Sequence, residues 1–127
     1  MIRSPAMLRS LLAAGVLGAS IAVSAGAAAA ADSFVAGTED LPLMPALRAV
    51  RDSAVVFDKP QGRIVEAKAT GRTTRDAVEK FYASTLPELG WTAEGRNVWR
   101  RENERLRIDL GGRDGDLTVG FTILPNH

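Results

Sequence analysis

Two long runs near the C-terminus alternate between apolar and polar residues, and no other feature constrains the fold as strongly. Residues 104–110 place Leu106, Ile108 and Leu110 at every second position, and residues 117–123 repeat the pattern. Successive side chains of a β-strand point to opposite faces, so each run indicates a strand with one apolar and one wet face. Together the runs predict an antiparallel sheet that is covered on one face only.

Shorter strands are expected before these two runs. Residues 54–57 form a valine-rich apolar segment, and residues 63–70 alternate after a turn at 58–62 that contains proline and glycine. Because proline and glycine favour turn geometry, this arrangement predicts a β-hairpin. Two further strands are predicted at residues 91–94 and 98–101, which are separated by polar turn residues.

One amphipathic helix is predicted between these two groups of strands. Thr73 is a suitable N-cap residue, with Asp76 at capping-box spacing, and Pro87 disfavours helical geometry at the residue before it. Between these limits, apolar side chains recur at helical intervals and form one stripe that can pack on the sheet: Ala77, Val78, Phe81, Tyr82, Thr85 and Leu86. Two ion pairs are expected on the wet side, Arg75 with Glu79 and Asp76 with Lys80.

These elements predict a single α+β domain over residues 54–124. One α-helix is packed on an antiparallel sheet in two layers, in the order β-β-α-β-β-β-β. Residues 32–53 precede the domain and contain Pro42 and Pro45, which exclude a regular helix or a central strand there. We expect this segment to be an extended arm whose large apolar side chains lie across the domain surface. The alternative is a docking peptide for a partner protein.

Residues 1–31 have the parts of an export signal. Arg3 and Arg9 supply a positive start, an uncharged apolar stretch follows, and residues 26–31 are glycine and alanine only. Because signal peptidases need small residues near the cut, we expect a signal peptide that is cleaved after residue 31. The glycines and serines of the stretch disfavour the alternative, a retained membrane helix. The predictions are export by the Sec route, a periplasmic or secreted location, and no transmembrane segment after processing.

The end of the predicted helix carries a packing motif that resembles a known group of sequences. An apolar stripe, a proline stop, a glycine reversal and an aromatic strand start follow one another as Val78-x-x-Phe81-Tyr82-x-x-x-Leu86-Pro87-x-Leu89-Gly90-Trp91. With the charged meander after it, this motif is similar to small exported proteobacterial proteins of uncharacterised function. The resemblance covers residues 54–124. It supports the fold and implies no activity, substrate or catalytic residue.

Few residues of this chain are suited to catalysis or metal binding. It has no cysteine, and its one histidine is the last residue, His127. Thiol catalysis, zinc fingers and histidine metal sites are therefore not expected, and the sequence contains no phosphate-binding or dinucleotide-binding glycine motif. Residues 111–116 are similar to one calcium-binding turn, but such sites need stacked repeats, so we expect a hairpin loop. The sequence predicts no catalytic residue, no cofactor and no metal.

Arginines concentrate in the predicted meander, although the formal net charge of the whole chain is only +1. If the apolar residues of 104–110 face the helix, Arg105 and Arg107 must face water. Arg100 of the neighbouring strand can join them. Because paired guanidinium hydrogen bonds hold anionic groups well, these three arginines are the predicted partner-binding residues. The alternative is cross-strand ion pairing with acidic neighbours, namely Glu66, Glu104 and Asp109.

The sequence supports two functional hypotheses. The first is a non-catalytic cell-envelope module that binds an envelope protein or an anionic envelope surface through the arginines, the arm or both. The second is a small-molecule-binding protein or minor enzyme with a pocket between helix and sheet, near Tyr82 and Trp91. Nucleic acid is not an expected partner, because the predicted compartment disfavours it.

Overall fold

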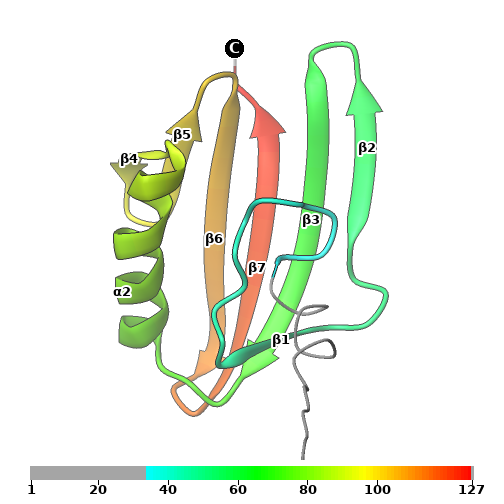
Figure 1. Ribbon diagram of the computed structural model, residues 1–127. Helices are drawn as coiled ribbons and strands as arrows, with labels where there is room; N and C mark the ends of the chain where they lie inside the picture. Colours follow the sequence, from blue (N-terminus) through cyan, green and yellow to red (C-terminus); the bar gives the residue numbers. More distant parts are fainter. Residues whose placement is uncertain (1–33, 127) are drawn as a thin grey trace, which may run out of the picture.

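The computed structural model describes residues 34–126, in which one antiparallel sheet carries a single α-helix and an N-terminal arm on the same face (Figure 1). The predicted signal peptide, residues 1–31, lies outside the described residues, as does His127. In chain order the elements are β1 (Leu47–Ala49), β2 (Val55–Lys59), β3 (Gly62–Gly71), α2 (Arg75–Thr85), the 3-10 helix η1 (Leu86–Leu89), β4 (Thr92–Gly95), β5 (Val98–Arg101), β6 (Glu104–Arg113) and β7 (Asp116–Pro125).

All strand pairs of the described sheet are antiparallel, in the order β1-β3-β7-β6-β5-β4, and β2 also pairs with β3. β1 and β2 lie along the same edge of β3, one on each half of this long strand. Between them, the Val50 N–H donates a hydrogen bond to the Lys68 carbonyl at 2.9 Å, and the Ser53 hydroxyl accepts one from the Lys68 N–H at 3.1 Å and donates one to the Val50 carbonyl at 2.8 Å. Ser53 therefore satisfies the Lys68 N–H where the edge is interrupted.

The predicted α+β class is confirmed, because the described chain is an antiparallel sheet with one α-helix. The predicted element order is incomplete, since the strand β1 comes before the first predicted hairpin and lies within the segment 32–53, which was expected to be an extended arm without a regular helix or a central strand. β1 has only three residues, and its pairing depends on the distant strand β3. A run this short has no alternation from which a strand can be recognised.

The arm and the helix together cover the apolar face of the sheet. Six strands lie side by side, which spans roughly 24 Å at the usual strand spacing, whereas a helix with its side chains is about 10 Å wide. Figure 1 shows α2 at the β4 and β5 end of the sheet and the arm in front of β7 and β3. Val35, Leu41 and Leu43 of the arm are buried in the same core as Val78 and Tyr82 of the helix. The arm therefore packs onto the domain.

Tyr82 joins the helix to the arm. Its hydroxyl donates a hydrogen bond to the Pro42 carbonyl at 2.8 Å and accepts one from the Met44 N–H at 3.2 Å. Its ring packs edge-on against Phe81 and against Phe121 of β7. Burial raises the pKa of the Tyr82 phenol well above its usual range, so the group stays neutral and can donate.

The start of α2 differs by one residue from the prediction. Thr74, not Thr73, is the N-cap residue, and its hydroxyl accepts a hydrogen bond from the Ala77 N–H at 3.0 Å. Thr73 is buried, and its carbonyl accepts a hydrogen bond from the Gly115 N–H of the β6–β7 turn. Both threonines are chemically able to cap, and the tertiary contact of Thr73 decides between them.

Of the two ion pairs predicted on the helix, Asp76 with Lys80 is confirmed at 3.3 Å. The other is wrong, because each partner finds a group on another element. Arg75 lies 3.8 Å from Asp114 of the β6–β7 turn, and Glu79 lies 3.1 Å from Arg96 of the β4–β5 turn.

The glycine-rich segment 111–116 is mostly strand. β6 ends at Arg113 and β7 begins at Asp116, so the turn consists of Asp114 and Gly115. Gly112 has a φ of +80°, and a Cβ there would collide with the Asp116 carbonyl oxygen. Only glycine therefore fits this position near the end of β6. The segment is thus a tight hairpin, which agrees with the interpretation as a hairpin and shortens the expected loop.

Candidate functional site

The second face of the sheet, which we call the open face, carries no buried side chain in any described strand. The three predicted partner-binding arginines all lie on it. Arg100 of β5 is paired in register with Arg105 of β6, and Arg107 lies two residues further along β6. Their positions follow from strand parity, because Leu106 between them points into the core.

Each of these arginines is ion-paired. Glu94 of β4 lies 2.8 Å from Arg100 and 3.3 Å from Arg105, and Asp109 lies 3.2 Å from Arg107. Asp109 was among the acids expected as ion-pair partners, whereas Glu94 was not. Exposed ion pairs contribute about 0–1 kcal/mol each, and a guanidinium has five N–H donors. The arginines therefore keep donors for another anionic group.

Of the other two expected acids, Glu104 pairs with different arginines, namely Arg63 at 2.8 Å and Arg101 at 3.7 Å. Its hydrogen bond with Arg63 raises the pKa of that guanidinium, although burial acts in the opposite direction. Glu66 forms no ion pair within residues 34–126. Glu104 has the same strand parity as the buried Leu106, so its pairs lie on the covered side of the sheet and leave the open-face arginines to Glu94 and Asp109.

An apolar patch lies beside the arginines on the same face. It consists of Val55 and Phe57 of β2, Ile64 of β3 and Leu124 of β7, and we call it the β2 patch. Phe57 is 54% exposed and Leu124 is 39% exposed. Phe57 pairs in register with Ile64, and Leu124 pairs with Arg105, so the patch is continuous with the arginines.

The β2 patch was not predicted as a surface from the sequence. Leu124 follows an inward residue of an alternating strand, so its parity alone indicated that it faces solvent. Phe57 belongs to a short apolar run without alternation, and such a run does not distinguish a buried strand from an exposed edge strand.

A shallow trough crosses the middle of the open face, with a volume of about 310 Å³. Its floor includes Gly120, whose missing side chain leaves the space above β7 empty. Lys68 and Asp109 are the register partners of Gly120 on either side, so the trough lies between a cationic and an anionic side chain.

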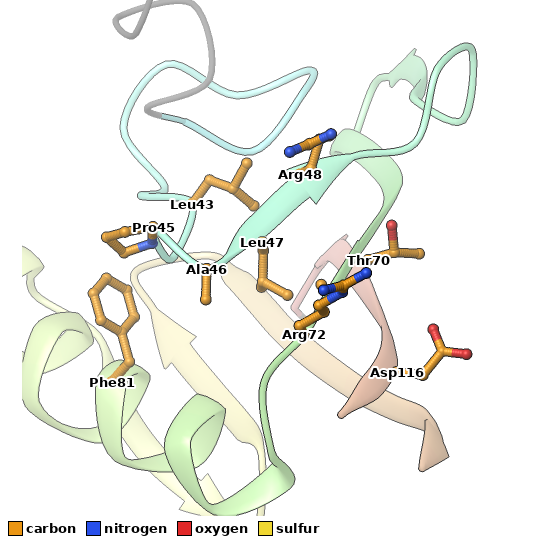
Figure 2. Close-up of a pocket in the computed structure, with 10 residues that line it drawn as sticks. Leu43, Pro45, Ala46, Leu47, Arg48, Thr70, Arg72, Phe81 and Asp116 are labelled. Carbon is orange, nitrogen blue, oxygen red and sulfur yellow. The ribbon is translucent and has the colours of Figure 1, made fainter. Parts of the chain in front are cut away.

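A larger groove of about 1100 Å³ lies at the end of the sheet, between β1, the helix and the β6–β7 hairpin. Figure 2 shows Pro45 and Phe81 toward one end of this groove, and Arg72, Thr70 and Asp116 toward the other. Arg48 of β1 also lines it. We call it the β1 groove. No sequence pattern indicated this site, because its residues come together only through the pairing of β1 with β3.

Tyr82 and Trp91, where a pocket was hypothesised, are 1% and 3% exposed, and neither lines the trough or the β1 groove. The guanidinium of Arg101 lies over the Trp91 ring, 4.4 Å from its centroid. Such a cation–π contact covers the indole from outside. In the described structure this region is occupied by packed side chains.

Within residues 34–126, no three or more histidine, cysteine or acidic side chains are grouped closely enough to hold a metal ion. No helix in this part of the chain has the length and apolar character needed to cross a membrane. Compared with known proteins, the chain matches no family model, no curated protein and no solved structure.

Proposed function

We propose that this protein is an exported, non-catalytic module of the cell envelope that binds a partner protein through the open face of its sheet. The observation that carries the proposal is the β2 patch, a group of exposed apolar side chains that adjoins Arg105 on a face with no buried residue. Exposed apolar side chains that are grouped on one face favour a surface that is covered in use.

The composition of the open face fits protein recognition. Protein interfaces place apolar and aromatic side chains at the centre and polar groups at the rim, and arginine is enriched in them. Here Phe57 and Leu124 supply the apolar centre, while Arg105 and Arg107 supply charge at its side. The partner surface that matches this arrangement has an apolar centre and acidic side chains beside it.

The export part of the proposal rests on the sequence of residues 1–31, with its positive start, uncharged apolar stretch and small-residue end. It places the working protein in the periplasm or outside the cell, after the signal peptide is removed. Sequencing the N-terminus of the protein recovered from the envelope fraction tests this part separately. A mature chain that begins near Asp32 supports export, and a chain that retains its first residue contradicts it.

The binding part is tested with open-face variants that leave the core intact. Leu124→Lys and Phe57→Thr remove the apolar centre, and the double variant Arg105→Gln, Arg107→Gln removes charge without adding acid. Leu89→Lys is the matched control, because Leu89 is 36% exposed, close to the value for Leu124, and lies on η1. Partners captured from envelope extract are identified by mass spectrometry, and the affinity of each purified partner is then measured.

For a true partner, we expect each apolar variant to reduce the affinity about tenfold or more, as for a residue at an interface centre. The double arginine variant should weaken binding and make it less sensitive to salt, because the lost contribution is electrostatic. Leu89→Lys should bind like the unmodified protein. Unchanged affinity of the apolar variants for every captured partner contradicts the proposal.

A further inference from the structure

The β1 groove is separate from the open-face patch and combines two kinds of surface. Its apolar part is formed by the end of the arm and by the helix, through Leu43, Pro45 and Phe81. Its polar part is formed around the end of β3, with Arg72, Thr70 and Asp116 on that side in Figure 2. A surface with this asymmetry is complementary to a ligand that is apolar at one end and polar at the other.

The arginines of the groove differ from most other arginines of the described chain in forming no ion pair. Seven of the arginines in residues 34–126 form ion pairs with acidic side chains. Within the same residues, neither Arg48 nor Arg72 forms one. With Asp116, these two arginines leave one net positive charge along the groove, which matches a ligand with a single negative charge.

The backbone that carries the two arginines is held in place. Arg48 belongs to β1 and pairs in register with Thr70 of β3. Gly71 lies directly against the arm, and a Cβ at this position would collide with the Ala46 carbonyl oxygen. Arg72 follows Gly71 and comes two residues before the N-cap Thr74 of α2. A binding surface on fixed elements loses little conformational entropy when a ligand is bound.

We infer that the β1 groove binds an amphipathic monocarboxylate, that is, a molecule with one carboxylate on an alkyl chain of the fatty-acid type. The carboxylate accepts hydrogen bonds from Arg48 and Arg72, and the alkyl chain lies on Pro45 and Phe81. Guanidinium groups bind carboxylates through paired hydrogen bonds, and the apolar part of the groove removes the chain from water. Asp116 opposes the carboxylate and limits the affinity. This inference does not depend on the proposed protein partner.

The inference is tested on the chain that begins at Asp32 with three small probes: octanoate, the neutral octanamide and acetate. Chemical shifts of the backbone amides report where each probe binds, and calorimetry gives the affinity. Octanoate should shift amides of β1, of the start of α2 and of Asp116. Octanamide and acetate should each bind about tenfold more weakly, because one lacks the charge and the other lacks the chain.

Variants separate the groove from general charge effects. Arg48→Gln and Arg72→Gln should each lower the affinity for octanoate by about tenfold, and Asp116→Asn should raise it. Arg113→Gln is the matched control, since Arg113 also forms no ion pair within residues 34–126 and does not line the groove. Circular dichroism confirms that each variant is folded before it is titrated.

Three outcomes overturn the inference. They are binding of octanamide as tight as that of octanoate, chemical-shift changes outside the groove, and a loss of affinity in Arg113→Gln as large as that in Arg72→Gln. A fourth result, binding of an apolar peptide with a free C-terminus but not of octanoate, assigns the groove to a peptide and also overturns it. None of these outcomes bears on the open-face variants, so the two proposals fail independently.

Discussion

The Tyr82 hydroxyl is the clearest point at which to test how the arm is held. Tyr82→Phe removes one oxygen and leaves the ring in place against Phe121. Two hydrogen bonds are lost, one to the Pro42 carbonyl at 2.8 Å and one from the Met44 N–H at 3.2 Å. A buried group that loses its partner costs about 1–3 kcal/mol. Because Pro42 and Met44 are only half-buried, we expect a loss of about 2 kcal/mol in the free energy of unfolding.

This loss is measured by urea denaturation, with the slope m expected to stay constant because the fold is unchanged. In a domain of this size it corresponds to a fall of roughly 8–16 °C in Tm. Ser84→Ala is the matched control: Ser84 is on the same helix, its hydroxyl is exposed, and its removal should change stability by less than about 0.5 kcal/mol. Hydrogen exchange at the Met44 amide should accelerate in Tyr82→Phe only. Equal stability of the two variants, with unchanged exchange at Met44, would refute the anchoring of the arm by this hydroxyl.

The remaining predictions concern pH and backbone fit. Burial raises the pKa of the Tyr82 phenol, so its stabilising effect is complete below about pH 10 and is lost as pH rises through the folded-state pKa. Tyr82 is the only tyrosine, so phenolate absorbance should appear together with unfolding; a reversible titration near pH 10 in the folded protein contradicts this. Hydrogen bonds from Arg96 and Asn97 lower the pKa of the Glu79 carboxyl, so its stabilising effect is present above about pH 4.3 and lost as pH falls through the folded-state pKa. Glu79→Gln should therefore be less stable than the unmodified protein at neutral pH and equal to it in acid; a pH-independent difference between the two contradicts this. Gly71→Ala should lower the free energy of unfolding by more than about 2 kcal/mol, because the new Cβ meets the Ala46 carbonyl oxygen, whereas Gly95→Ala, with open space around it, should change stability by less than about 0.5 kcal/mol.

The regular parts of the fold were predictable because they depend on local pattern. The bounds of β5 were predicted at residues 98–101 as observed, and the inward faces of β6 and β7 followed from alternation over many residues. β1 was not predicted because a three-residue strand is too short to show alternation between apolar and polar residues. It forms only by pairing with the edge of β3. Leu89 of the packing motif is exposed, because Gly90 reverses the chain and Trp91 enters the core instead.

For the candidate sites too, features that depend on the local sequence pattern were predictable, and features that depend on contacts between distant residues were not. That Arg105 and Arg107 face solvent followed from strand parity alone. That Glu94 binds Arg100 and Arg105 did not, because the register of β4 against β5 shifts between Ala93 and Gly95. A bulge of this kind changes which side chains meet, and the sequence does not mark it. The β1 groove depends entirely on distant pairing.

Binding of a partner protein by the open face is tested most directly by photo-crosslinking in intact cells. A photoreactive amino acid is placed at Leu124, at Phe57 or, as a control of similar exposure, at Leu89. After irradiation, crosslinked products are identified by mass spectrometry. We predict that Leu124 and Phe57 give the same envelope-protein adduct and that Leu89 does not. An adduct that forms equally from Leu89, or no adduct from either open-face position, would contradict the account.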